Sequence, residues 1–536
     1  MAANTQGEIK PVVVDDSLVV DNQEQTRAMD IDSLLKNLGN CGNFQKIFCV
    51  LSYSPVLPAA WSLMFMTFGS YNPGWTCQDQ STSNSTGILQ SLINMTISDE
   101  LNLTMSACDT MRSCQNIVFN DIATTVVTEF TLICYQSWIS PFIISIQMIG
   151  VTLGSVVGGQ IGDKFGRKFS IYGCASLLVL TNIIAIFSVS WQMYTFIRLV
   201  IGFCAGSILA TCAVYALELM PQLWRGVIGT LPIWSVATFS FGLCVLALKN
   251  WKYVHIATAL FSFVTFLPVF WLPESLRFLT VHGKIQRGQK VVQKIARLNK
   301  RPLPDITIMS RIAEKEKEDR KNRSTYTYLD LFHRNIRRSS VVLGMSWFIF
   351  SIGYYMIGFG LNALSGDFFV NLLLYTAISF PSRTIAMFIS AKFGIKFVVT
   401  TFICVASLCS FSVVAVQFLA PEYSKATLTL VMTFGSSMMM EGCWAALSTM
   451  VVELSPTPVR NLSYGFCTSL ARIGSIIAPY MILREAIPLF GAFLLLGILQ
   501  LVCVLGILTL PNTKGKPIPD NFLQKTTRSD TNNIIL

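Results

Sequence analysis

Twelve apolar runs divide this chain, and each is long enough to cross a bilayer as a helix. An α-helix rises about 1.5 Å per residue, so roughly 20 residues span the hydrocarbon core. Only 13% of the 536 residues are charged, whereas soluble domains average about 25%. The pattern therefore predicts an all-α membrane protein with twelve transmembrane helices in two groups of six. The runs lie near 47–68, 138–161, 169–189, 192–214, 226–248, 254–272, 340–362, 368–391, 397–418, 425–448, 462–484 and 486–509.

Two long polar stretches interrupt the series, and their basic residues predict the side of the membrane that each one faces. The 69–137 stretch has a single basic residue, Arg112, whereas the 273–338 stretch is rich in Lys and Arg. Because cytosolic segments are enriched in positive charge, we expect 69–137 outside, 273–338 inside and both termini in the cytosol. The spacing of apolar residues at 284–299 predicts an amphipathic helix. The expected segments are a cytosolic amino-terminal segment (1–46), a first six-helix half (47–272), a cytosolic bridge (273–338), a second half (340–509) and a cytosolic tail (510–536).

The predicted outer loop carries the signals of an extracellular segment. Asn-x-Ser/Thr sequons and cysteines cluster there, although such sequons also occur by chance. Four cysteines in an oxidising compartment could form two disulfides in any of three connectivities, and the sequence leaves all three open. The remaining cysteines fall mostly in the predicted helices, where packing is their expected role. The sequons are at Asn84, Asn94 and Asn102, and the loop cysteines are Cys77, Cys108, Cys114 and Cys134.

Two short motifs recur in the two groups of runs. Asp163-Lys-Phe-Gly-Arg-Lys168 follows the second run, and Ala391-Lys-Phe-Gly-Ile-Lys396 follows the eighth. Glu218-Leu-Met-Pro-Gln-Leu-Trp-Arg225 follows the fourth run, and Glu453-Leu-Ser-Pro-Thr-Pro-Val-Arg460 follows the tenth. Two matches in corresponding loops predict a duplicated architecture in which two six-helix halves are related by an axis along the membrane normal.

The same loops supply opposite charges at the predicted cytosolic mouth. Ion pairs between the halves could hold the inner side closed and break when it opens, so we expect these residues to act in gating. The alternative is that the basic residues only set the topology, but topology alone does not require the acids. The second copy lacks one pair, with Ala391 and Ile395 at the corresponding positions. The predicted gating residues are Asp163, Arg167, Glu218, Arg225, Glu453 and Arg460.

These motifs resemble those of a known family. Gly159-Gln-Ile-Gly-Asp-Lys-Phe-Gly-Arg-Lys168 resembles the loop signature of the major facilitator superfamily, and Arg198-x3-Gly202-x3-Gly206 its fourth-helix motif. Trp271-Leu-Pro-Glu-Ser-Leu-Arg277 resembles the signature of the organic cation, anion and carnitine transporters, solute carrier family 22. The resemblance runs from about residue 31 to 520, with Leu276 and Asn512 as departures. It implies a carrier of small organic ions that works by alternating access.

Charged residues inside the predicted helices bear on the cargo, because such residues usually face a cavity or a partner. At the position of Arg472 the resemblance implies Asp in cation transporters and Arg in anion and carnitine members. Arg383 matches a position that is basic in some anion members, and Ser379 replaces a residue that is usually acidic. An arginine can hold a carboxylate through two parallel hydrogen bonds. The balance favours an anionic or zwitterionic cargo.

Glu441 complicates this interpretation. It lies 12 residues before Glu453, while Arg472 lies 12 residues after Arg460, so each should be about 18 Å from the same inner turn. We therefore expect Glu441 to pair with Arg472 at equal depth. Two alternatives stay open: Glu441 binds the ammonium group of a zwitterion or cation, or it titrates as a proton-coupling site because burial raises its pKa.

Aromatic residues are expected to form the apolar part of the binding site. Trp347, Tyr354 and Tyr355 on the seventh run resemble residues of anion members, and Trp234 and Phe241 on the fifth run are candidates from the other half. Aromatic faces bind flat rings and also attract cations, so they do not decide the charge of the cargo. Packing or lipid-facing roles are equally open for Trp347, Trp234 and Phe241, whereas the match favours ligand contact for Tyr354 and Tyr355.

Other functional classes find little support. A Gly-x4-Gly-Lys-Ser/Thr phosphate loop is absent from the sequence, and its three histidines lie outside the middle of the predicted helices, so we expect no enzyme activity, cofactor or metal. The basic residues lie between apolar runs, which argues against nucleic acid. The sequence predicts a plasma-membrane transporter of organic anions or zwitterions such as carnitine-like compounds, with a coupling ion or counter-substrate left open. The alternatives are an organic cation transporter that uses Glu441, and a transport-inactive receptor or scaffold.

Overall fold

A computed structural model describes residues 31–77, 108, 114, 116–221, 224, 232–303, 310, 313–314, 327–456, 459–482 and 488–513. The predicted glycosylation sites Asn84, Asn94 and Asn102 and the predicted gating residue Arg225 lie outside these residues. The chain divides into two compact units. The smaller unit comprises 1–50, 215–229 and 273–323, and the larger unit comprises the rest of the chain.

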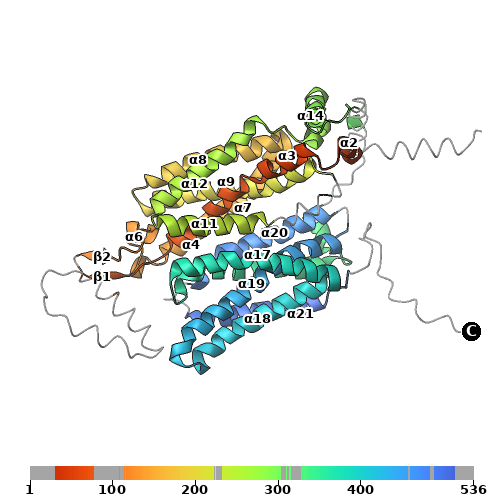
Figure 1. Ribbon diagram of the computed structural model, residues 1–536. Helices are drawn as coiled ribbons and strands as arrows, with labels where there is room; N and C mark the ends of the chain where they lie inside the picture. The colour runs from red at the N-terminus through yellow and green to blue at the C-terminus, as the bar shows by residue number, and fades with distance from the viewer. Residues whose placement is uncertain are drawn as a thin grey trace, which may run out of the picture. The chain divides into compact units, whose positions relative to one another are not determined.

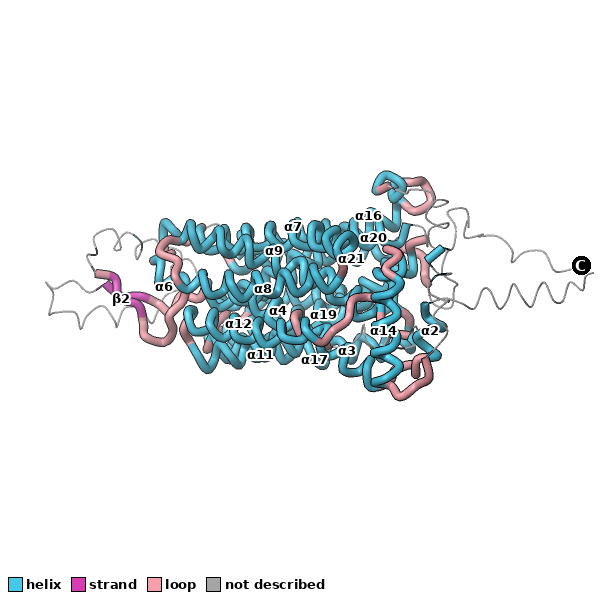
Figure 2. The backbone as a smooth tube through the Cα atoms, turned by 90° about the horizontal axis from the view of Figure 1, so that it is seen from above, coloured by secondary structure: helices cyan, strands magenta, loops and turns pink. Residues whose placement is uncertain are grey.

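Each of the twelve apolar runs contains helix in the described residues. The first group is α3 (Asn43–Tyr53) continued by α4 (Val56–Gly69), α7 (Ile139–Phe165), α8 (Arg167–Ile186), α9 (Trp191–Glu218), α11 (Ile233–Leu248) and α12 (Trp251–Phe266). The second group is α16 (Arg337–Phe359), α17 (Phe368–Phe393), α18 (Ile395–Leu419), α19 (Glu422–Leu454), α20 (Arg460–Ile477) and α21 (Leu489–Leu508). In the larger unit these helices run alongside one another (Figures 1 and 2). The predicted all-α membrane architecture is confirmed.

Helix composition separates α19 and α20 from most of the others. Nine spans in the described residues are long and apolar enough to cross a membrane, and α11 is apolar but shorter. Neither α19 nor α20 is among those spans, and each holds a charged residue in its interior: Glu441 in α19 and Arg472 in α20. A charge at a helix centre costs roughly 2.5–3.5 kcal/mol on insertion scales. These two helices are therefore the expected location of a polar site.

The two copies of the first repeated motif form the same kind of turn. Gly166 ends α7 and begins α8 with a φ of 119°, and Gly394 ends α17 and begins α18 with a φ of 94°. Residues with a side chain rarely adopt this backbone conformation, whereas glycine does so without steric cost. Both motifs therefore need a glycine at this position for the backbone conformation, whatever the charges around it. The internal duplication thus extends to the backbone.

Helices α7 and α9 pack at backbone distance. A Cβ atom on Gly154 would lie 1.9 Å from the carbonyl oxygen of Phe203, and one on Gly206 would lie 2.1 Å from that of Val151. Gly150, Gly158 and Gly202 make similarly close approaches. Small residues at such spacing let transmembrane helices associate through close van der Waals contact.

Arg198 of the fourth-helix motif is fully buried, at 0% exposure, in the first helix group. Its guanidinium donates hydrogen bonds to the Ser62 carbonyl oxygen (2.8 Å) and to the Gln147 side chain, and it lies 5.0 Å from the ring of Phe65. The neighbouring His255 is also buried and is hydrogen-bonded to Tyr194. Neutral acceptors and aromatic faces therefore hold this buried cation and link α4, α7 and α9.

The described ends of the predicted outer loop form a small cross-linked structure. Strands β1 (Trp75–Cys77) and β2 (Ile117–Phe119) pair antiparallel, with Trp75 opposite Phe119. Disulfides join Cys77 to Cys114 and Cys108 to Cys134, which selects one of the three connectivities that the sequence left open. Glu129 in α6 (Val126–Phe130) forms a 2.7 Å ion pair with Lys252 of α12. This ion pair ties the loop to the adjoining helix. The two strands were not predicted, because each is too short to show a strand pattern in a polar sequence.

The smaller unit contains the short helices of the segments that are predicted to be cytosolic. They are α2 (Ile31–Asn37), α13 (Leu276–Val281) and α14 (Ile285–Leu298). Asn299 follows α14 and accepts a hydrogen bond from the Phe44 amide (2.9 Å) while donating to the Leu38 carbonyl oxygen (2.9 Å). The predicted amphipathic helix is confirmed, because α14 buries Val291, Val292 and Ile295.

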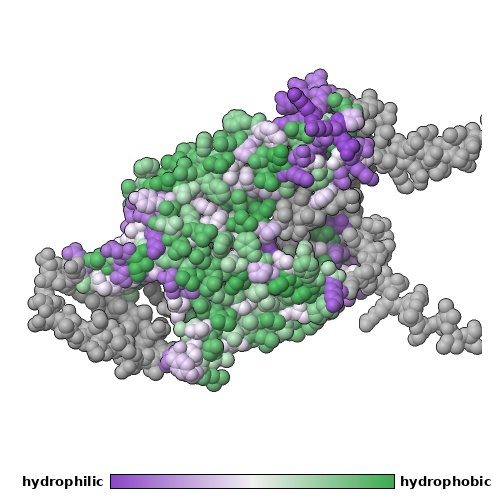
Figure 3. Space-filling model, viewed as in Figure 1, coloured by the Kyte–Doolittle hydropathy of each residue, from purple (hydrophilic) through white to green (hydrophobic). Residues whose placement is uncertain are grey.

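The outer surface of the helices in the larger unit is apolar. Leu180 of α8 and Leu260 and Phe263 of α12 are exposed large hydrophobic residues. Figure 3 shows hydrophobic residues covering much of the face formed by these helices. An apolar surface of this extent is what a bilayer requires of the helices that face lipid.

Candidate functional site

Helices α17 and α19 approach closely beside the charged residues of the second half. A Cβ atom on Gly442 would lie 2.7 Å from the Ser382 hydroxyl and 2.9 Å from its carbonyl oxygen. The Ser382 hydroxyl also donates a hydrogen bond to the Met438 carbonyl oxygen on α19. Contacts this short fix the two helices relative to each other, and therefore also the residues that flank them, Arg383 and Glu441.

Arg383 and Glu441 form an ion pair across this contact. The Nη2 atom of Arg383 lies 2.7 Å from Oε1 of Glu441, and its Nε atom donates a 2.8 Å hydrogen bond to the same oxygen. The Glu441 side chain is almost fully buried, at 4% exposure, whereas that of Arg383 is 24% exposed. The expected pairing of Glu441 with Arg472 is therefore wrong in this structure. Equal depth on two helices does not place two side chains together, and the helix that faces Glu441 here is α17.

Arg472 lies on α20, which packs closely on α16. A Cβ atom on Gly474 would lie 2.6 Å from the carbonyl oxygen of Phe348. The Ser145 hydroxyl of α7 donates a 2.7 Å hydrogen bond to the Ile476 carbonyl oxygen, so α20 also contacts the first helix group. Arg472 itself is partly buried, and it makes no ion pair within the part of the chain that the structure describes. Among the described residues, no carboxylate therefore neutralises the positive charge of this guanidinium.

An aromatic cluster connects the two helix groups. The indole nitrogen of Trp234 on α11 donates a 2.9 Å hydrogen bond to the Tyr354 hydroxyl on α16. The Tyr354 ring lies 5.3 Å from the ring of Tyr355 and 6.1 Å from that of Trp444 on α19. Trp347 also lies 5.3 Å from Trp444. Trp234, Tyr354, Tyr355, Trp347 and Trp444 therefore form one aromatic cluster. Sequence reasoning missed Trp444, although it follows Glu441 by three residues and so shares its helix face.

The aromatic cluster adjoins the ion pair. The hydroxyls of Tyr354 and Tyr375 both lie within electrostatic range of the Glu441 carboxylate. The indole N–H of Trp347 is buried and lacks a hydrogen-bond partner among the described residues. The structure thus brings Trp234, Tyr354, Glu441 and Arg383 into one polar and aromatic site near the contact between the two helix groups.

Phe241 and Tyr355 have packing neighbours of their own. Phe241 is fully buried on α11 and lies 6.1 Å from the ring of Trp61 on α4. Tyr355 is 7% exposed and stacks on Phe359 at 5.7 Å. Of the predicted aromatic residues, Phe241 is therefore the one that the structure places in the packing of the first helix group.

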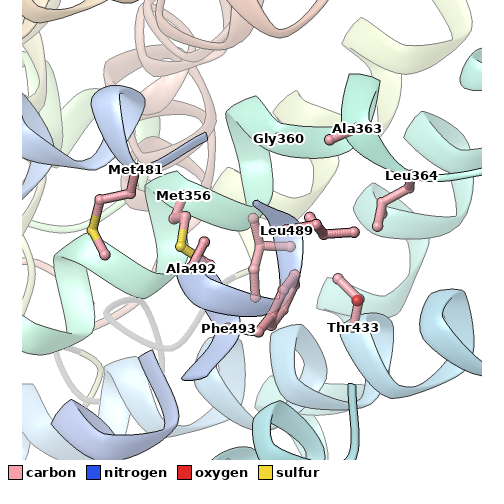
Figure 4. Close-up of a pocket in the computed structure, with 10 residues that line it drawn as sticks. Met356, Gly360, Ala363, Leu364, Thr433, Met481, Leu489, Ala492 and Phe493 are labelled. Carbon is pink, nitrogen blue, oxygen red and sulfur yellow. The ribbon is translucent and has the colours of Figure 1, made fainter. Parts of the chain in front are cut away.

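A separate pocket lies towards the amino-terminal end of α19 and opens among α16, α21 and the short helices η4 (Gly360–Ala363) and η6 (Ala478–Ile482) (Figure 4). Its lining is apolar except for the hydroxyl of Thr433 and includes Met356, Met481 and Phe493. None of the predicted site residues lines it. A carboxylate or ammonium group would find no opposite charge in this lining.

The predicted gating residues occupy helix ends. Asp163 and Arg167 flank the α7–α8 turn and form an ion pair with each other. Glu453 lies in the last turn of α19, and Arg460 begins α20. Glu218 ends α9 in the smaller unit. The charges therefore lie at helix ends on both repeats, and their role in gating stays a prediction.

The family model for sugar (and other) transporters matches residues 112–520. Solute carrier family 22 member 6-A of Xenopus laevis is 27% identical over 92% of this chain and 93% of its own length. An organic cation transporter protein of Drosophila melanogaster is 26% identical over 92% of this chain and 94% of its own. The human organic cation/carnitine transporter 2 is 27% identical over 75% of this chain and 71% of its own.

Solved structures agree on the fold. The xylose transporter XylE from E. coli, in a partially occluded inward-open conformation, matches with a TM-score of 0.61 at 14% identity, over 88% of this chain and 99% of that one. Together with the helical architecture, this shows the major facilitator fold, and the match to the family model makes the chain a multi-pass membrane transporter. The chain belongs to the sugar (and other) transporter family, and the curated proteins that it resembles include members of solute carrier family 22 and organic cation/carnitine transporters.

Proposed function

We propose that this transporter carries small organic anions or zwitterions, such as carnitine-like compounds, by alternating access between its two six-helix halves. The observation that carries the proposal is how the three charged residues of the second half, Arg383, Glu441 and Arg472, are paired. Glu441 is paired with Arg383, whereas Arg472 has no carboxylate partner among the described residues. An unneutralised guanidinium in a membrane helix attracts a carboxylate or sulfate, which it can bind through parallel hydrogen bonds.

Organic cations are the second candidate. Among the predicted site residues Glu441 is the only acid, and it is almost fully buried and engaged by Arg383. A cation would have to displace this guanidinium from Glu441 before it could be bound by charge. Aromatic faces at Trp234, Tyr354 and Trp444 could still attract a cation, but the same faces bind flat anionic rings equally well.

The remaining parts of the proposal follow the predicted topology. With both termini in the cytosol, the helix ends at Asp163, Arg167, Glu218, Glu453 and Arg460 face inward and, together with Arg225, control the inner side. The loop with Asn84, Asn94 and Asn102 faces outward, where these residues accept glycans at the plasma membrane. The disulfides Cys77–Cys114 and Cys108–Cys134 suit that oxidising side. A receptor or scaffold without transport would need neither Arg472 nor the charged helix ends.

Uptake of three labelled compounds by one expressing cell line tests the proposal. We expect cells with the transporter at their surface to take up benzoate or carnitine, because each offers a carboxylate to Arg472. Tetraethylammonium, which has no acceptor group, should enter at the rate of untransfected cells. Preferential tetraethylammonium uptake would support the cation alternative. Uptake of none of the three, with the protein at the surface, would favour a receptor.

A further inference from the structure

We propose that Glu441 restricts the cargo to a single net negative charge. It does so by neutralising Arg383, so that of the two arginines proposed to bind the cargo, only Arg472 lacks an ion pair among the described residues. This inference rests on the proposed function and adds a rule for which anions are accepted. It concerns a residue for which the family resemblance provides no expectation.

The geometry makes the Arg383–Glu441 pair a fixed part of the site. The carboxylate is nearly fully buried, and both close contacts from Arg383 reach its Oε1 atom, at 2.7 and 2.8 Å. The close approach of Gly442 to Ser382 holds the two helix backbones at this point. A buried charge that loses its partner incurs a large desolvation penalty. Glu441 will therefore keep Arg383, and a weakly bound anion will not displace it.

The charges of the site then sum to one. Taken as one set, Arg383 and Arg472 contribute +2 and Glu441 contributes −1, whereas tyrosine hydroxyls are neutral near pH 7. A carboxylate on the cargo neutralises the remaining charge. A second carboxylate would find Arg383 already occupied and would be repelled by Glu441 in a medium of low dielectric constant. Monoanions and zwitterions fit this balance, whereas dianions do not.

Removing the charge of Glu441 should therefore release Arg383 for a second carboxylate. Glu441→Gln keeps a side-chain oxygen that can accept a hydrogen bond from Arg383 while deleting the negative charge. The probes are benzoate and phthalate, which share a ring and differ by one carboxylate. We expect the wild type to favour benzoate over phthalate by about tenfold or more, the scale of one lost charge-assisted hydrogen bond. In Glu441→Gln, the ratio of phthalate uptake to benzoate uptake should rise by about tenfold.

Two further variants separate the charge of Glu441 from other effects. The double variant Glu441→Gln with Arg383→Gln again leaves Arg472 as the single cation, so the gain in phthalate uptake should be lost. Glu422→Gln is the matched control, because it removes one negative charge from the same helix at an exposed position that pairs with Lys425. It should leave the ratio of benzoate to phthalate uptake unchanged. All rates are divided by the amount of protein at the cell surface, measured by biotinylation.

The outcomes distinguish this inference from the proposed function. If the wild type takes up benzoate and Glu441→Gln shows the wild-type ratio, Glu441 does not set the charge limit and only this inference is overturned. If the wild type takes up neither benzoate nor carnitine, the proposed function is overturned and the inference with it. Competition in the wild type provides an answer even if Glu441→Gln fails to reach the surface. Unlabelled benzoate should inhibit the uptake of labelled benzoate at about tenfold lower concentration than phthalate, and equal inhibition would contradict the proposal.

Discussion

Replacing Arg472 with Ala is expected to reduce the uptake of a labelled organic anion by about tenfold to a hundredfold. A hydrogen bond to a charged group contributes about 1.5–3 kcal/mol, and each 1.4 kcal/mol corresponds to about a tenfold change. Arg383 cannot take over this role, because its guanidinium is held by Glu441 at 2.7 Å. The measurement is initial benzoate uptake per unit of surface protein.

Two variants calibrate that result. Arg472→Lys keeps the charge but loses the two parallel donors of a guanidinium, so it should retain an intermediate rate. Lys425→Ala removes a cation from the outer end of α19, where Lys425 pairs with the exposed Glu422, and should leave uptake near the wild-type value. Wild-type benzoate uptake by Arg472→Ala would mean that the anion is recognised elsewhere in the molecule.

Replacing Gly154 with Leu is expected to prevent the accumulation of folded transporter. The Cβ atom alone would lie 1.9 Å from the Phe203 carbonyl oxygen on α9, so α7 and α9 would have to separate. Overpacking of a core typically costs about 1–3 kcal/mol, and a collision with backbone atoms exceeds that range because no side chain can rotate away. The amount of protein at the cell surface and the monodispersity of the solubilised protein measure the effect.

Gly173→Leu is the matched control for Gly154. Gly173 lies on α8, and a Cβ atom built there meets no other atom within 4 Å. We expect this variant to reach the surface in amounts close to the wild type and to elute as a single species. Normal surface amounts of Gly154→Leu would show that the α7–α9 contact is looser than the structure indicates.

The architecture could be predicted from the sequence because each element has a local signal. The apolar runs are set by the thickness of the bilayer, and the repeated Lys-Phe-Gly turns follow from the positive φ at Gly166 and Gly394. The outer disulfide pairing could not be predicted, since it depends on how β1 and β2 bring Cys77 close to Cys114. The fourth-helix motif that contains Arg198 also gave no sign that this residue is fully buried among neutral hydrogen-bond acceptors.

The site was predictable as a set of residues but not as a set of contacts. Arg383, Glu441, Trp234 and Tyr354 were all candidates, and the structure joins them through an ion pair and a hydrogen bond. The predicted partner of Glu441 was wrong because counting residues from a turn gives only the depth of a residue along its helix. Pairing also depends on which two helices face each other. Ser382 and Gly442 decide that for α17 and α19, and their contact is not visible in the sequence.

Exchange by the purified full-length protein in proteoliposomes tests the central claim most directly. Vesicles loaded with unlabelled benzoate should accumulate labelled benzoate from outside above its equilibrium level, since a carrier that alternates between two faces exchanges internal for external cargo. Vesicles that contain Arg472→Ala protein should not do so. Exchange of labelled tetraethylammonium in vesicles loaded with tetraethylammonium, with no benzoate exchange at all, would contradict the account of an anion carrier centred on Arg472.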